Sequence, residues 1–63
     1  MDMIIECLSA NGFNQYIDNA PIIPRVGESI VLYKTLESSV QITRTVAHIE
    51  YDFTSSKIYV SVR

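Results

Sequence analysis

The chain has 63 residues, of which 48% are hydrophobic, and seven acidic and five basic side chains give it a net charge of −2. A chain of this length forms a single domain, residues 1–63, with a small core, and its hydrophobic content is too high for a disordered protein. The basic residues are dispersed, which argues against a surface built for nucleic acid or for anionic lipid.

Cysteine usage and hydropathy point to the cytoplasm. Cys7 is the only cysteine and His48 the only histidine, which excludes an internal disulfide and a zinc site made of Cys and His from one chain. No apolar run approaches the roughly 20 residues that span a bilayer. The first residues carry no basic side chain, so we expect no signal peptide. We therefore expect a cytoplasmic protein with no membrane partner, metal or small-molecule cofactor.

The first third of the chain reads as two short strands. Asp2–Ser9 is rich in aliphatic residues, and the Asn11-Gly12 dipeptide that follows is the strongest short signal for a hairpin turn. Phe13–Asp18 returns as a second strand, and its polar residues indicate an edge position.

A proline-containing connection separates these strands from the next one. Prolines within Asn19–Gly27 lack an amide hydrogen, so this segment does not fit a central strand. We expect three apolar residues of the segment to pack over one end of the core and Gly27 to adopt a turn conformation. The three are Ile22, Ile23 and Val26. Ser29–Tyr33 then forms the third strand, and Lys34–Ser39 a polar turn.

The segment Val40–Phe53 is the longest run without Gly or Pro, and β-branched and aromatic residues dominate it. Its apolar residues occupy one parity up to Val46 and the other parity from Ile49 onward. One inserted residue produces such a change, so we predict a β-bulge near Ala47–His48. The bulge bends the strand, so that its two halves can form part of two sides of a small barrel.

The last segment, Lys57–Arg63, alternates between apolar and polar residues and predicts a hairpin with the long strand. Placing Asp52 opposite Lys57 fixes the register. It predicts polar pairs on the outer face, Glu50 with Tyr59 and His48 with Ser61. It also predicts apolar pairs on the inner face, Tyr51 with Ile58 and Ile49 with Val60, so Tyr51 is expected in the core.

Five short strands joined by tight turns predict an all-β fold, a small five-stranded antiparallel SH3-like barrel with a bulged fourth strand. The stretch Pro21–Leu32, PIIPRVGESIVL, resembles the proline–x–x–glycine–acidic–x–aliphatic pattern of small SH3-like barrel proteins, among them short proteins of bacteria and their phages. Val46-Ala47-His48 resembles the strand that follows in these proteins. The resemblance covers about two-thirds of the chain. It implies a fold and transfers no catalytic residue or activity.

Two candidate sites have simpler interpretations. His48, Glu50 and Asp52 lie on one face of a strand and together could bind a divalent ion. Successive residues on one face are nearly 7 Å apart along a strand, however, which is wide for shared ligation, so we interpret them as a solvated face. Cys7 could be a nucleophile, but a cysteine in an apolar strand is usually a small buried hydrophobe, and nothing indicates an activating environment. We therefore expect no enzymatic activity.

Outward-facing tyrosines give the remaining functional signal. Exposed Tyr side chains anchor protein partners, and beside basic residues they can also stack nucleobases. The simpler interpretation is a tyrosine that shields a twisted sheet. The candidate binding residues are Tyr59, Lys57, Tyr33, Arg44 and His48.

Three classes of function follow from these observations. We expect a non-enzymatic module that binds a protein partner or self-associates into an oligomer. The alternative is a single-stranded nucleic-acid-binding module that uses the face with Tyr59, Lys57 and Arg44, which the acidic balance disfavours. Small size and the resemblance imply a third class, an accessory or inhibitor protein encoded by a phage or bacterium.

Overall fold

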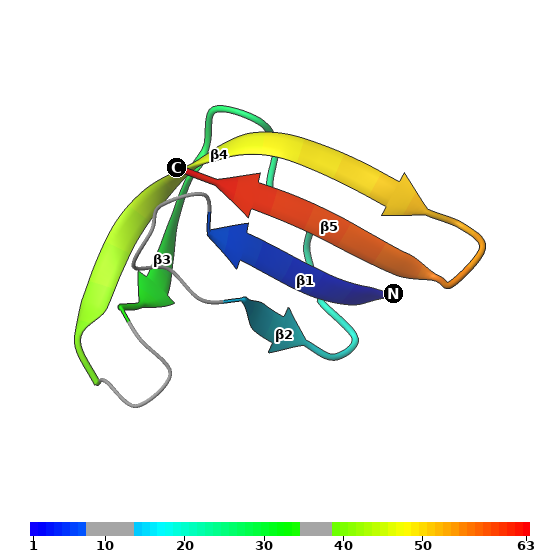
Figure 1. Cartoon of the computed structure of the whole chain (residues 1–63), viewed down its shortest axis with the longest axis horizontal. Helices are drawn as coiled ribbons and strands as arrows, with labels where there is room; N and C mark the ends of the chain where they lie inside the picture. Colours follow the sequence, from blue (N-terminus) through cyan, green and yellow to red (C-terminus); the bar gives the residue numbers. More distant parts are fainter. Residues whose placement is uncertain (8–13, 35–38) are drawn as a thin grey trace.

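The computed structural model of the chain describes residues 1–7, 14–34 and 39–63. These residues form strands and no helix, as the sequence predicts (Figure 1). The strands are β1 (Asp2–Cys7), β2 (Gln15–Ile17), β3 (Ser29–Tyr33), β4 (Gln41–Asp52) and β5 (Lys57–Val62). The turn expected at Asn11-Gly12, and residues 35–38 of the turn expected at Lys34–Ser39, lie outside the described residues.

The strands form one curled sheet in the order β2-β1-β5-β4-β3. Neighbouring strands pair antiparallel except β1 and β5, which are parallel, so the expectation of a wholly antiparallel barrel is wrong. The parallel pairing of β1 with β5 follows from the number of strands between them. Each strand runs opposite to the one before it in the chain, so the first and the fifth run the same way and can only pair in parallel. β2 is an edge strand, as predicted.

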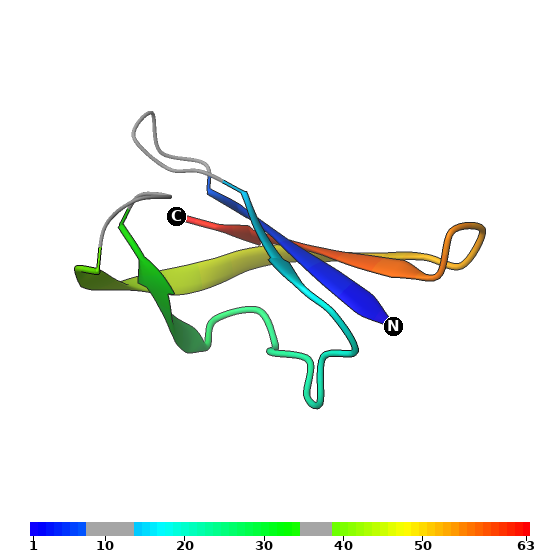
Figure 2. The same ribbon diagram turned by 90° about the horizontal axis from the view of Figure 1, so that it is seen from below.

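β4 bends across the fold and joins its two sides (Figure 2). Its first residues pair with β3 and its later ones with β5, and the register shifts between Val46 and His48, which confirms the predicted bulge. Just before the bulge, two adjacent residues of β4 form backbone hydrogen bonds with different segments of the chain. The backbone of Thr45 exchanges hydrogen bonds with Arg63, at 3.0 and 3.3 Å, whereas the Val46 N–H donates to the carbonyl of Glu28 at 2.9 Å.

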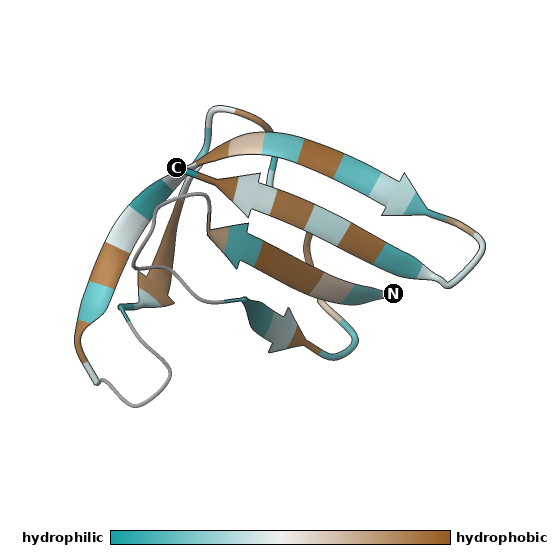
Figure 3. Cartoon of the chain, viewed as in Figure 1, coloured by the Kyte–Doolittle hydropathy of each residue, from teal (hydrophilic) through white to brown (hydrophobic). Residues whose placement is uncertain are grey.

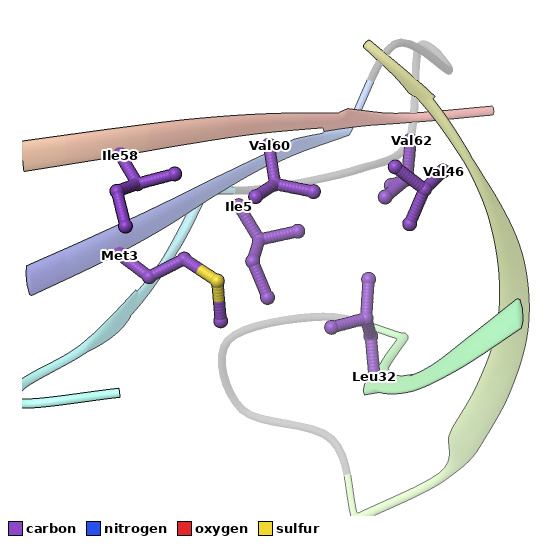
Figure 4. Close-up of a cluster of buried hydrophobic side chains, with 7 residues drawn as sticks. All are labelled: Met3, Ile5, Leu32, Val46, Ile58, Val60 and Val62. Carbon is purple, nitrogen blue, oxygen red and sulfur yellow. The ribbon is translucent and has the colours of Figure 1, made fainter. Parts of the chain in front are cut away.

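The core lies inside the curl, where β1 and β5 face β3 (Figure 4). Every second residue of β5 points inward, and Figure 3 shows the resulting alternation of hydropathy along β4 and β5. The predicted β4–β5 register is confirmed, from Asp52 opposite Lys57 to His48 opposite Ser61. The buried cluster consists of Met3, Ile5, Leu32, Val46, Ile58, Val60 and Val62.

Two expectations about burial are wrong. Tyr51 is 48% exposed and stacks on Phe53, with ring centroids 6.1 Å apart, because it lies in the part of the β4–β5 hairpin that extends past the pairing of β4 with β3 (Figure 1). The expected packing of Ile22, Ile23 and Val26 over the core is also absent, since all three are exposed. Ala20 is the residue of this connection that packs on the core. Gly27 has the predicted turn conformation, with φ of +93°.

Asp52 closes the β4–β5 hairpin by capping its turn. The carboxylate accepts hydrogen bonds from the backbone N–H and hydroxyl groups of both Thr54 and Ser55. The Thr54 and Ser55 hydroxyl donors lower the pKa of Asp52 to about 2, because they favour the ionised carboxylate.

This pKa predicts a loss of stability in acid. The folded protein holds Asp52 ionised down to about pH 2, whereas the unfolded chain takes up the proton near pH 4. The contribution of Asp52 is therefore complete above pH 4 and falls as the pH drops toward 2. We expect Asp52→Asn to remove this part of the pH dependence in urea unfolding followed by circular dichroism. Asp18→Asn is the control that keeps it, and equal acid sensitivity of both variants would contradict the role of the cap.

Candidate functional site

The sheet leaves a groove of about 450 Å³ between its two ends, where β1 and β2 face β3. The groove exists because the curl is incomplete: within the described residues no ladder joins β2 to β3. Among the residues that the structure describes, one hydrogen bond links the two edges, from the Gln15 side-chain amide to the Tyr33 carbonyl at 3.2 Å. No charged residue lines it in the described part of the chain. The lining residues are Met3, Ile5, Gln15, Ile17, Ile22, Pro24, Ile30, Val31, Leu32, Tyr33 and Gln41.

β3 supplies the exposed apolar side of this groove. Ile30 and Leu32 point toward the core, so Val31 and Tyr33 point away from it and are 61% and 50% exposed. Ile22, at 78% exposed, adds a further large apolar side chain from the connection before β3. Exposed apolar residues that gather beside an unpaired strand are typical of interaction surfaces.

A second, polar hollow of about 250 Å³ lies on the outer face of β1, β5 and β4. It is lined by Glu6, His48, Glu50, Tyr59 and Ser61. His48 Nε2 lies 3.8 Å from a carboxylate oxygen of Glu50, and both side chains are solvated. Tyr59 is half-buried, and its neighbours in register are Ile4, which is buried, and Glu50. This is the environment expected of a tyrosine that shields the sheet.

The structure divides the predicted binding residues between these places. Tyr59 and His48 line the polar hollow, and Lys57 lies on the same face of β5, nearer the hairpin turn. Tyr33 lines the apolar groove on the other side of the fold. Arg44 is apart from both: it pairs with Ile30, and its guanidinium donates to the backbone carbonyl of Thr43 at 3.0 Å.

Sequence reasoning missed the groove because it depends on which strands pair. Gln15, Ile17 and Ile30 face one another only because β1 pairs with β5, which leaves β2 and β3 as the two ends of the sheet. One feature of the local sequence could have indicated the groove. Ser29–Tyr33 contains no charged residue, whereas an edge strand is commonly protected by charge.

The structure places the residues that the sequence suggested for metal binding or nucleophilic chemistry. The described residues contain no group of three His, Cys, Asp or Glu side chains that could hold a metal ion. The carboxylate of Asp52, which alternates with His48 and Glu50, is engaged by Thr54 and Ser55. Cys7 is partly buried against the core. In the same part of the chain, no helix has the length and apolar character needed to cross a membrane.

Comparisons of the chain with protein-family models, curated proteins and solved structures find no match.

Proposed function

We propose that this protein is a non-enzymatic binding module for protein, and that the groove between β2 and β3 is its binding surface. The observation that carries the proposal is a groove whose described lining is uncharged and mainly apolar, beside an edge of β3 that pairs with no described strand, with Tyr33 and Val31 exposed. Tyrosine and aliphatic anchors in an apolar recess are the side chains that contribute most to protein interfaces. The resemblance of Pro21–Leu32 to SH3-like barrel proteins supports the further proposal that the curled sheet is of the SH3-like type.

The alternative, single-stranded nucleic acid, fits the outer face poorly. Glu6 and Glu50 line the same hollow as Tyr59, so their carboxylates would repel the phosphates of a strand stacked there. We expect a labelled oligonucleotide titrated at low salt to give no saturable binding. Binding that weakens as salt rises would favour nucleic acid over protein.

Two matched variants test the proposed surface. Immobilised wild-type protein, Tyr33→Ala and Tyr59→Ala would each be exposed to an extract of the source cells. The partner is expected to be retained by the wild type and by Tyr59→Ala, and lost from Tyr33→Ala. Light scattering on the same three proteins detects self-association. Retention that depends on Tyr59 and not on Tyr33 would contradict the proposal, as would a strict monomer that retains no protein.

A further inference from the structure

We infer that the protein forms a symmetric dimer through the free edge of β3, with the two copies of the strand antiparallel and the two-fold axis at Val31. This inference rests on the proposed protein-binding function and names its partner, a second copy of the chain. It is carried by the hydrogen-bonding parity of β3 and by the charges at the two ends of the strand.

The parity of β3 follows from its ladder with β4. The Lys34 N–H donates to the Val40 carbonyl at 2.8 Å, and the Val46 N–H donates to the Glu28 carbonyl at 2.9 Å. Antiparallel partners alternate between bonded and non-bonded pairs, so the even-numbered residues of β3 bond to β4. The odd-numbered residues therefore direct their N–H and C=O groups to the free edge.

The bond from Gln15 to the Tyr33 carbonyl is consistent with this parity, because it reaches β3 from the side away from β4. Ser29 and Val31 direct their backbone groups the same way. No strand pairs with this edge in the described parts of the chain. An edge of this kind is a template for another strand.

A two-fold axis at Val31 aligns the edge-directed backbone groups of both copies, and the Tyr33 carbonyl, which accepts from Gln15 within the chain, would accept from Ser29 of the second copy. Val31 then meets Val31 of the second copy, and Ser29 meets Tyr33, all as hydrogen-bonded pairs. The non-bonded pairs between them bring Ile30 next to Leu32, where cross-strand side chains lie closest. No charged residue falls within the paired segment, because Ser29–Tyr33 has none.

The flanking charges select this register. The axis at Val31 places Glu28 of each copy opposite Lys34 of the other, so two opposite-charge pairs close the ends of the shared sheet. Glu28 and Lys34 are both exposed, and neither forms an ion pair with another described residue of its own chain. One Glu28 carboxylate oxygen accepts the Arg25 N–H, which fixes the side chain near the start of β3.

A strand of five residues buries less area than the roughly 1,200 Å² of a standard stable interface. The dimer is therefore weak, and we expect it to dissociate on dilution from about 1 mM to about 10 µM in sedimentation equilibrium.

Charge reversal tests the register. In Lys34→Glu two Glu residues face each other at both ends, and in Glu28→Lys two Lys residues do, so each variant alone is expected to dimerise about tenfold more weakly than wild type. Mixing the two variants recreates both opposite-charge pairs and is expected to restore dimerisation. Arg63→Glu is the control, because it carries the same net charge as Lys34→Glu and lies on the opposite side of β4 from β3. Because it keeps Glu28 and Lys34, Arg63→Glu alone is expected to dimerise as wild type does, and a weakening equal to that of Lys34→Glu would overturn the register.

A cross-link tests the axis directly. The Cα atoms of a hydrogen-bonded antiparallel pair lie about 5.5 Å apart, within the range that a disulfide spans. In a Cys7→Ser background, Val31→Cys is expected to form a disulfide-linked dimer when oxidised glutathione accepts the electrons. Thr43→Cys, one strand further inside the sheet, is expected to remain unlinked.

Failure of the inference and failure of the proposed function are distinguishable. A protein that stays monomeric at about 1 mM, with no cross-link at Val31→Cys, overturns the dimer. If that monomer still retains a partner in a Tyr33-dependent manner, the groove binds a different protein and the proposed function stands.

Discussion

Ile58→Ala is expected to leave most of the protein unfolded in water at 25 °C. Ile58 is fully buried on β5, between Met3 on β1 and Tyr51 on β4. Replacing a buried isoleucine by alanine costs about 2–5 kcal/mol, from lost apolar burial and from the cavity that remains. A core of this size rarely supplies more than about 3–5 kcal/mol of net stability, so the loss is comparable to the whole.

Urea unfolding followed by far-ultraviolet circular dichroism measures this effect. Ile22→Ala is the matched control, because it removes the same atoms from a side chain that is 78% exposed, and we expect a change within about 0.5 kcal/mol. A loss below about 1 kcal/mol in Ile58→Ala would show that β5 does not hold the centre of the core.

The sequence alone predicted the strands and the β4–β5 register because these depend on local alternation. Ile58, Val60 and Val62 share one parity, and the opposite register would expose all three, so only one pairing with β4 buries them. The same reasoning located the bulge, since the parity of the apolar residues changes between Val46 and Ile49.

The alternation of apolar and polar residues along a strand does not determine which strands are neighbours in the sheet. The wrong expectations all depend on that order of strands. The parallel pairing of β1 with β5 joins residues about 55 positions apart, which no local pattern encodes. Tyr51 has the parity of a core residue, but it is exposed because β3 pairs with only the first half of β4. The groove depends on the same non-local order, so Tyr33 was predicted as a binding residue without the recess that it lines.

Deletion of Ala47 is expected to abolish cooperative folding. Ala47 lies at the register shift, between Val46, which is fixed to the start of β3, and His48, which pairs with Ser61. Without the extra residue, β4 alternates regularly through both halves. Ile42, Val46 and Ile49 then lie on one face of a regular strand, but β4 loses the bend and the added twist that a bulge provides, so its first half no longer carries β3 over the core.

Loss of the bend is costly for a small domain, because Leu32 on β3 moves away from the β1 and β5 side chains of the core cluster. Exposing one buried leucine costs about 1.5–3 kcal/mol, which is comparable to the net stability of about 3–5 kcal/mol that a core of this size supplies. We therefore expect a broad urea transition of low amplitude and amide proton shifts that collapse toward unfolded values. Ala47→Ser is the control, since it keeps the residue count and the bulge and should remain within about 1 kcal/mol of wild type. A deletion variant that unfolds cooperatively at the wild-type midpoint would mean that the bulge in β4 is not needed to join the two sides of the sheet.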